Sequence, residues 1–130
     1  MQTKMKMNQM PKEEAEKFLA EAAVGRLGSI GADGFPYVVP LNFAYANGFI
    51  FFHGRNAGEK IENIIRNAKV SFEVDTMHSL RQGDSACSSG TRYTSVIVKG
   101  SAGLVEDKAE KASALDYIVT KYTPQHAGAT

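Results

Sequence analysis

The chain has 130 residues, a formal net charge of +1 and a single cysteine, Cys87. This length suits one domain whose core is shared with a second copy, so we expect a single domain over residues 1–130 that forms a homodimer. The balanced charge gives no reason to expect nucleic acid or an anionic membrane as a partner, because both need a basic patch or stripe. One cysteine excludes an intrachain disulfide and a multi-cysteine metal site, which suits a reducing compartment.

The sequence shows no sign of membrane insertion or of secretion. No apolar run approaches the roughly 20 residues of a membrane span. The polar start MQTKMKMNQMPKEE lacks the apolar core of a secretory signal. We therefore expect a cytoplasmic protein with no membrane association.

An amphipathic helix is the first predicted element. Pro11 suits a first helical turn, and Glu13 and Glu14 suit the positive end of a helix. Apolar residues then recur at helical spacing, and the helix should end before Gly25. The expected apolar stripe consists of Ala15, Phe18, Leu19, Ala22 and Ala23.

Two strands follow, and the second is long. Residues 24–31, VGRLGSIG, predict a short strand, and residues 35–46, FPYVVPLNFAYA, predict a long strand in which larger and smaller residues alternate. The expected core face carries Phe35, Tyr37, Val39, Leu41, Phe43 and Tyr45. The expected flat face carries Pro36, Val38, Pro40, Asn42 and Ala44.

An Asn-Gly turn at residues 47–48 joins this long strand to the strand FIFFHG, because both turn positions need positive φ. A two-residue turn fixes the register of the hairpin, which pairs Ala44 with Phe51 and Asn42 with His53. Directly opposed residues have Cβ atoms about 4.5–5.5 Å apart. Asn42 and His53 should therefore be cross-strand neighbours.

A second helix and another strand come next. Asn56 suits the cap of this helix, and Glu59 stands three residues later as its capping-box partner. The helix has an apolar stripe of Ile61, Ile64, Ile65 and Ala68. Residues 70–75, VSFEVD, alternate as a strand, whereas residues 76–90 are too polar for a core and predict a long loop.

The last region combines strand and helix signals. Residues 91–107 predict one or two strands with a bend near Gly100 or Gly103. Asp107 suits the cap of a final helix, with Glu110 in the reciprocal position. The stripe of this helix consists of Ala112, Leu115, Ile118, Val119 and Tyr122.

The order of these elements predicts a mainly β, α+β protein. Hairpin connections dominate, so the sheet should be mainly antiparallel. Five or six short strands with helices at the margins favour a small barrel over a doubly wound sheet.

The corner where the strand FIFFHG meets the second helix suits a ligand. Asn42 and His53 would share the flat face, on which a planar molecule fits. Pro40 cannot donate a ladder hydrogen bond, so the strand should be irregular there and leave backbone groups free to bind the polar rim of a flat heterocycle. The alternative interpretation is a barrel edge that binds no ligand.

Lys60 adds a possible phosphate site to this corner. It falls in the first turn of the second helix, after Gly58, which allows a close backbone approach. The unpaired N–H groups and the dipole of a helix start could hold a phosphate together with Lys60 and Arg55. The alternative interpretation is an ordinary solvated lysine.

Other chemistry has weaker support in the sequence. No Walker loop or GxGxxG motif is present. His78 and His126 have no spacing that resembles a metal site, so none is expected. Ser95 and His53 lack a nucleophile elbow and an orienting acid, which argues against a hydrolase.

Three stretches together resemble the pyridoxamine 5′-phosphate oxidase-like flavin-binding superfamily, in the branch related to nitroimidazole-resistance proteins. They are VGRLGSIGADGFPYVVPLNFAY, FFHGRNAGEKIENIIRNAKVSFEVD and TRYTSVIVKGSAGLVEDKAEKASAL, and the resemblance runs from about Ala22 to Tyr122. It implies a six-stranded antiparallel split β-barrel with flanking helices that dimerises. It also implies one flavin mononucleotide (FMN) in each of two clefts at the dimer interface.

The resemblance further implies which residues bind the cofactor. The isoalloxazine would be lined by Val39, Pro40, Leu41 and Asn42. The remaining contacts would be His53 and Gly54 beside the cofactor, Lys60 at the phosphate, and Ser95 from a later strand. The arginine that precedes this lysine in pyridoxamine phosphate oxidases is Glu59 here, and Arg55 or Arg92 could compensate for the missing positive charge.

The resemblance also separates two activities. Pyridoxamine phosphate oxidases hold their substrate with basic and histidine residues after a tryptophan-containing carboxyl segment. This chain has no tryptophan and ends soon after Tyr122, so oxidation of that vitamin is not expected. In the nitroimidazole-resistance branch the implied activity is reduction of a nitro group to an amine, with a histidine at the position of His53 next to the cofactor.

We therefore expect a homodimeric, FMN-dependent oxidoreductase that reduces nitroaromatic or similar small compounds. In this interpretation His53 binds the flavin or the substrate and donates a proton, and Asn42 orients it or the ring. The alternative is a non-catalytic flavin or haem carrier or redox sensor, in which His53 would be an axial ligand of the haem iron.

Overall fold

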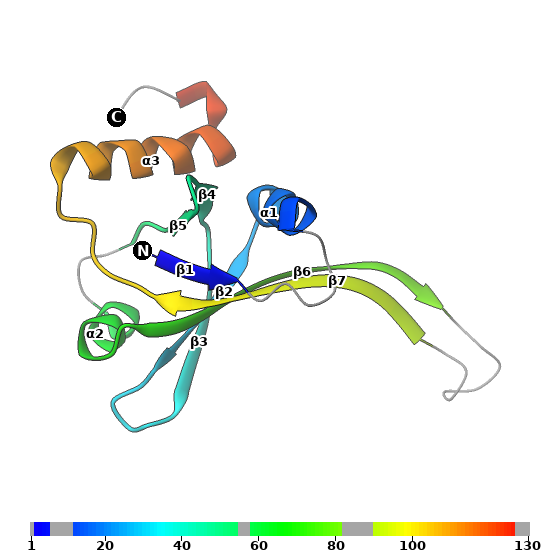
Figure 1. Ribbon diagram of the computed structural model, residues 1–130, viewed down its shortest axis with the longest axis horizontal. Coiled ribbons are helices and arrows are strands. Elements are labelled where there is room, and N and C mark those ends of the chain that lie inside the picture. Colours follow the sequence, from blue (N-terminus) through cyan, green and yellow to red (C-terminus); the bar gives the residue numbers. More distant parts are fainter. Residues whose placement is uncertain (1, 6–11, 55–57, 82–89, 127–130) are drawn as a thin grey trace.

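The computed structural model of the chain describes residues 2–5, 12–54, 58–81 and 90–126 (Figure 1). Its strands are β1 (Gln2–Met5), β2 (Gly25–Ile30), β3 (Pro36–Leu41), β4 (Ala44–Ala46), β5 (Phe49–Phe51), β6 (Lys69–Arg81) and β7 (Gly90–Ser101). Its helices are α1 (Lys12–Glu21), α2 (Glu59–Arg66), α3 (Lys108–Tyr122) and a short 3-10 helix, η2 (Pro124–His126).

The strands form two antiparallel sheets. A five-stranded sheet has the order β1-β7-β6-β2-β3, and β4 and β5 form a separate two-stranded hairpin. Figure 1 shows α3 above this hairpin, and β6 and β7 extend together as a long arm beyond the rest of the sheet. The described part of the chain is therefore mixed α+β with mainly antiparallel sheets, as its sequence predicts.

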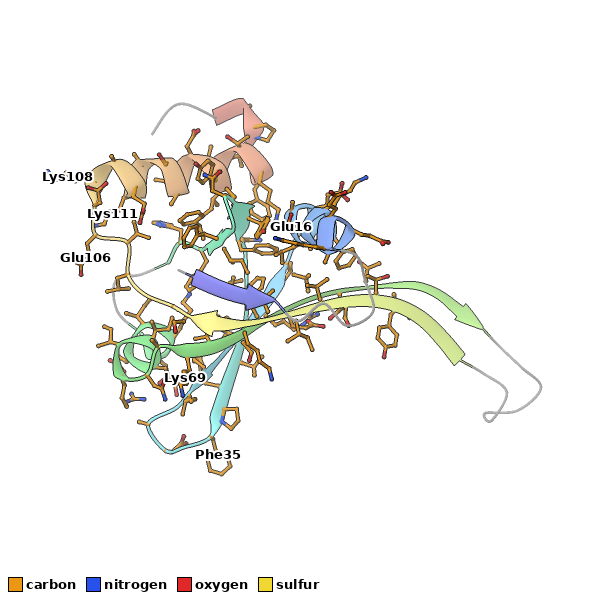
Figure 2. The ribbon with its side chains drawn as sticks, viewed as in Figure 1. Glu16, Phe35, Lys69, Glu106, Lys108 and Lys111 are labelled. Carbon is orange, nitrogen blue, oxygen red and sulfur yellow. The ribbon has the colours of Figure 1, made fainter. Side chains whose placement is uncertain are left out.

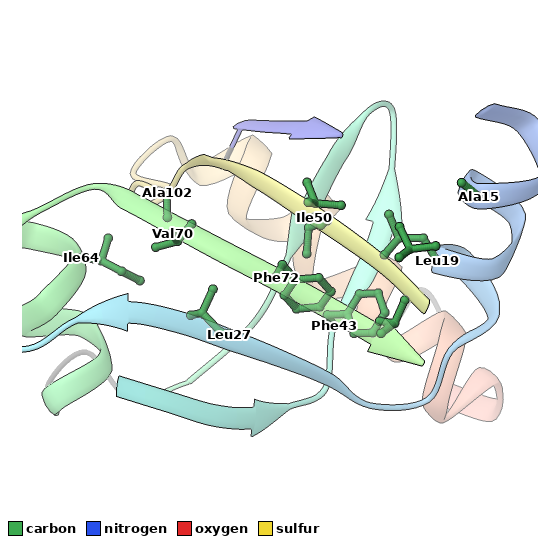
Figure 3. Close-up of a cluster of buried hydrophobic side chains, with 12 residues drawn as sticks. Ala15, Leu19, Leu27, Phe43, Ile50, Ile64, Val70, Phe72 and Ala102 are labelled. Atoms are coloured by element: carbon green, nitrogen blue, oxygen red, sulfur yellow. The ribbon is translucent and has the colours of Figure 1, made fainter. Parts of the chain in front are cut away.

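The core lies on one face of the five-stranded sheet because side chains alternate along each strand. Along β6, Val70, Phe72 and Val74 are buried, while the residues between them are exposed or half-buried. The ring of Phe72 meets the ring of Phe43 edge to face, with centroids 4.8 Å apart. Leu27 of β2 packs into the same cluster, which Figure 3 shows between the strands and α1.

Several local predictions are confirmed. Helix α1 buries Ala15 and Leu19 of the expected stripe. The backbone N–H of Glu110 donates a hydrogen bond to Asp107 Oδ2 (2.9 Å), so Asp107 caps α3. The turn at residues 47–48 has φ values of 54° and 81°, and the hairpin pairs Ala44 with Phe51 in the expected register.

The long strand predicted over residues 35–46 is wrong in two respects. Phe35 lies outside β3 and is 72% exposed, at the tip of the β2–β3 turn (Figure 2). The strand also breaks between Leu41 and Ala44. At this break the Phe43 N–H donates to the hydroxyl of Tyr122 (3.0 Å) instead of to a neighbouring strand, and that hydroxyl donates to the carbonyl of Ala23 (2.8 Å).

The predicted loop over residues 76–90 is also wrong at its two ends. Residues 76–81 belong to β6 and Gly90 belongs to β7, and the two strands pair with a register shift between Met77 and Ser79. Backbone pairing between the two strands continues through this polar stretch, so the polar composition does not end the strands. Residues 82–89 lie outside the described residues.

Two smaller differences lie at the start of α2 and in β1. Helix α2 begins at Glu59 with Gly58 as its N-cap, so the predicted capping box of Asn56 and Glu59 is wrong. Asn56 itself lies outside the described residues. The strand β1, which pairs with β7, has no counterpart among the predicted elements. The strand β7 ends at Ser101, between the two glycines where a bend is predicted.

Candidate functional site

The corner at the end of β5 brings a glycine and a lysine together. The chain leaves β5 at Phe51, and both His53 and Gly54 are exposed. A Cβ atom added to Gly54 would lie 3.0 Å from Lys60 Nζ, so the ammonium group sits against the backbone there. Lys60 Nζ is also 5.5 Å from the centroid of the Phe52 ring, a distance at which a cation is attracted to the ring face. Among the described residues, the corner thus brings one positive charge, that of Lys60, close to the backbone of Gly54.

The start of α2 lies at the same corner, because Lys60 in its first turn approaches Gly54. Gly58, the N-cap, has φ 128° and makes no side-chain cap hydrogen bond. The first amides of a helix that lack such a cap can bind an anion, and Lys60 lies in this turn. Glu59 and Glu62 share the turn, so an anion here would also meet two carboxylates. Lys60 and the helix dipole are the groups that must offset them.

The four residues expected to line a flat ligand, three in β3 and one just after it, divide into two sets. Val39 and Leu41 pack against the core cluster, so only their backbone groups can meet a ligand on the opposite face. Pro40 and Asn42 are exposed. The Asn42 side chain donates a hydrogen bond to the carbonyl of Ala23 (3.3 Å), which orients its amide.

The predicted cross-strand pairing of Asn42 with His53 is wrong. The β4–β5 ladder ends at Ala44 and Phe51, two residues short of this pair, and both side chains lie outside the strands. The register is as predicted, but the chain diverges where Phe43 turns into the core.

Ser95 lies on the outer face of the five-stranded sheet, which we define as the β2, β3, β6 and β7 side chains that point away from the core cluster. It is exposed and stands opposite Asp75. On the same face, Arg26 Nη1 lies 2.8 Å from Asp75 Oδ2 and 3.0 Å from Glu73 Oε1. Partial burial and a hydrogen bond with Asp75 raise the pKa of Glu73, and Arg26 opposes this effect.

Arg26 connects this ion cluster to β3, because it is also in register with Pro40. The structure therefore groups Pro40 and Ser95 on one outer face and His53, Gly54 and Lys60 at the corner. Arg26 was not predicted as a site residue, since its partners are distant in the chain and only the sheet register brings them together.

A cavity of about 460 Å³ adjoins the corner. His53 and Gly54 line it, together with side chains of α2, the segment 103–106 and α3. The charged residues at this cavity, Glu106 and Lys111, were not predicted as site residues. The apolar stripe of α3 was visible in the sequence, but its contact with the corner depends on where the helix packs.

Several residues discussed from the sequence have no described side chain. Arg55 and Cys87 lie outside the described residues, and the side chains of His78, Arg92 and His126 are not described. In the described ranges, no three His, Cys, Asp or Glu side chains gather as a metal-binding group. Among the helices of those same ranges, none is long and apolar enough to cross a membrane.

The family of the chain follows from its sequence as well as its fold. Residues 11–130 match the family model described as pyridoxamine 5′-phosphate oxidase. The chain therefore belongs to this family, and the resemblance noted in its sequence is confirmed. A comparison with curated proteins found no match.

Two solved structures are similar in both sequence and fold. One is a proposed 5-nitroimidazole antibiotic resistance protein from Bacteroides thetaiotaomicron, with 32% identity, a TM-score of 0.78, and coverage of 95% of this chain and 72% of that chain. Another is an FAD-binding protein from Mesorhizobium loti, with 28% identity, a TM-score of 0.67, and coverage of 97% and 80%.

A third structure is similar in fold alone. It is an FAD and heme binding protein from Mycobacterium smegmatis, with 19% identity and a TM-score of 0.83. The match covers 94% of this chain but 58% of that protein, so the chain spans little more than half of it.

Proposed function

We propose that the chain is a single domain over residues 1–130 that forms a homodimeric split barrel, binds FMN and reduces nitroaromatic or similar small compounds. The observation that carries this proposal is the placement of Lys60 Nζ against Gly54 beside the start of α2, where the N-cap Gly58 has no side chain to bond the first amides. The family of the chain and its 32% identity to the Bacteroides thetaiotaomicron protein support it.

The corner fits the phosphate of a flavin nucleotide. Lys60 supplies the positive charge, and the amides at the start of α2 supply hydrogen-bond donors. Gly54 lacks a Cβ, so the Lys60 ammonium can lie close to its backbone. FAD is an alternative nucleotide, since two of the similar proteins are described as binding it.

The ring of the flavin would lie along the exposed edge of β3. Pro40 and Asn42 offer their side chains on that side, while Val39 and Leu41 offer backbone groups. Ser95 approaches from β7 on the outer face. When bound, FMN supplies the hydride or electron transfer, and these residues hold its ring in place and exclude water from one side.

The outer face supports the homodimer. Large apolar side chains are exposed on it: Val38 is 62% exposed, Ile97 50%, Met77 63% and Tyr93 68%. These side chains are interspersed with the ion cluster of Arg26, Glu73 and Asp75, so the face combines apolar and charged groups. A second copy packed on this face would cover these side chains and form a cleft between the two sheets.

His53 is the proposed proton donor. Its side chain is exposed at the corner, between the cavity and the residues proposed to hold the cofactor. Histidine side chains exchange protons near neutral pH, which suits protonation of a nitro group as it is reduced. Replacing His53 by alanine should slow nitroimidazole consumption by about 10²–10⁴-fold while FMN stays bound.

The experiment that tests this function combines a spectrum with a reaction. The purified full chain is titrated with FMN, FAD and haemin, and the absorption spectrum shows which one binds. The FMN-loaded protein is then reduced without oxygen and mixed with a 5-nitroimidazole, whose consumption is measured for the native chain and for His53→Ala. Full activity in the variant would contradict the assigned role of His53. If the native chain did not consume the nitroimidazole, the proposed reductase activity would be rejected.

A haem or flavin carrier is the second candidate. It is favoured by the fold of the FAD and heme binding protein and by the exposure of His53 beside a cavity, where an imidazole could ligate iron. A Soret band that is lost in His53→Ala would support this candidate. Flavin binding without turnover of any nitroaromatic would support a flavin carrier.

A further inference from the structure

The cavity next to the corner has the size and lining of a small-molecule site. Its volume of about 460 Å³ falls in the usual range of roughly 300–1,000 Å³ for such sites. Its wall is mostly apolar and is formed by the end of β5, by Ile61 and Ile64 of α2 and by Leu115 and Ile118 of α3. A site of this kind binds the apolar body of a ligand and orients it with a few polar groups.

The packing of α3 explains why the space is open. Among the described side chains, α3 has no buried residue, whereas α1 buries Ala15 and Leu19 completely. Leu115 and Ile118 are half-buried and line the cavity instead of closing it. Well-packed interiors contain few voids larger than a water molecule, so a space of this size leaves these side chains without contacts that a ligand could supply.

The polar groups at the cavity define the charge of that ligand. They are His53 at the corner, Glu106 in the segment before α3, and Lys111 in the first turns of α3. Figure 2 shows Glu106 and Lys111 near the amino-terminal end of this helix. Lys111 can pair with one anionic group, and Glu106 disfavours a second negative charge.

We propose that this cavity binds a small amphiphilic carboxylate. Its apolar body fills the space between α2 and α3, and its carboxylate pairs with Lys111 and accepts a hydrogen bond from His53. The ligand would lie beside the corner proposed to hold FMN, because His53 and Gly54 line both. Its binding does not require that FMN be bound.

Calorimetric titration of the full chain tests the proposal, with naphthalene carboxylate as the probe and naphthalene methanol as its neutral match. A charge-assisted hydrogen bond contributes enough that the carboxylate should bind about tenfold more tightly than the alcohol. In Lys111→Ala this preference should disappear while alcohol binding is unchanged. Lys108→Ala, on an exposed lysine of the same helix that does not line the cavity, should behave as the native chain.

A second pair of variants tests the cavity itself. Ala114 lines the cavity and Ala112 is exposed elsewhere on α3. Ala114→Trp should fill the space and abolish binding of both probes, whereas Ala112→Trp should leave binding unchanged. Ala114→Leu, which adds less volume, keeps the test decisive if the tryptophan variant does not fold.

Three outcomes would overturn the proposal. They are equal binding by the Ala114 and Ala112 variants, an unchanged preference for the carboxylate in Lys111→Ala, and no binding of either probe to the native chain. In the last case, a change in the oligomeric state of Ala114→Trp relative to the native chain would assign the cavity to contact between copies of the chain. FMN affinity should be the same in Ala114→Trp and the native chain, so failure here is distinguishable from failure of the proposed flavin site.

Discussion

On the inner face of the five-stranded sheet, side chains such as Phe72 and Leu27 are almost completely buried, whereas at the corner His53 and Gly54 are exposed. The inner face is held by apolar contacts among many neighbours. At the corner, the described residues show a close contact of another kind, Lys60 against the backbone of Gly54. Stability and ligand binding should therefore respond to different substitutions.

The largest expected effect comes from the inner face. Phe72→Ala removes a ring that is 2% exposed and packs edge to face on Phe43, so the free energy of unfolding should fall by about 3–5 kcal/mol. Phe35→Ala makes the same substitution at a side chain that is 72% exposed and should change it by less than about 0.5 kcal/mol. Chemical denaturation measures both, and equal effects would show that burial does not distinguish the two sites.

Substitution of Tyr122 should have the next largest effect on stability. Its hydroxyl lies within hydrogen-bond distance of three backbone groups near the break between β3 and β4. It accepts from the Phe43 N–H, donates to the carbonyl of Ala23 and lies 3.0 Å from the carbonyl of Phe43. Tyr122→Phe leaves these groups without their partner and should lower the free energy of unfolding by about 1–3 kcal/mol.

Tyr117→Phe provides the control, because its hydroxyl contacts only the exposed Asn47 side chain among the hydrogen bonds described. It should cost less than about 1 kcal/mol in the same denaturation experiment. If Tyr122→Phe and Tyr117→Phe were equally stable, the hydrogen bonds of the Tyr122 hydroxyl would not stabilise the break between β3 and β4.

A smaller, pH-dependent effect is expected at Lys121. Burial lowers the pKa of this lysine from 10.5 to about 8, and its Nζ lies 3.7 Å from the centroid of the Phe43 ring, which favours the charged form and opposes the shift. Between pH 8 and 10.5 the unfolded chain then binds more protons, so the native chain should gain stability as pH rises through this window.

Lys121→Met removes this titration and separates it from other groups. Among the described residues Lys121 Nζ is buried without a hydrogen-bond partner, but the residue as a whole is only partly buried. The gain relative to the variant should therefore be about 1 kcal/mol. Thermal unfolding of both proteins across the window measures it. A stability difference that stays constant with pH would contradict the assigned shift.

The features that the sequence predicts well depend on neighbouring residues. The turn at residues 47–48, the cap at Asp107 and the buried stripe of α1 follow from local chemistry, and so does the proximity of Gly54 and Lys60, which lie in one strand-to-helix turn. The strand break at Phe43 depends on Tyr122, which is 79 residues away.

The same distinction holds for the candidate site. The register of the hairpin was predictable. The unpaired position of Asn42 was not, because the ladder ends at Ala44 and the residue between them, Phe43, is buried in the core. The cavity beside His53 depends on how α3 packs, and no local pattern indicates that Lys111 reaches it. Contacts between distant segments therefore account for most of what the sequence did not reveal.

The central claim, that the corner binds the phosphate of FMN, is tested most directly by comparing FMN with riboflavin, which lacks the phosphate. The native chain should bind FMN more tightly than riboflavin, and Lys60→Ala should reduce that preference by about tenfold or more without changing riboflavin affinity or stability. Lys69→Ala, at an exposed lysine on β6, should leave the preference intact. An unchanged preference in Lys60→Ala, or equal affinity of the native chain for both flavins, would contradict the account.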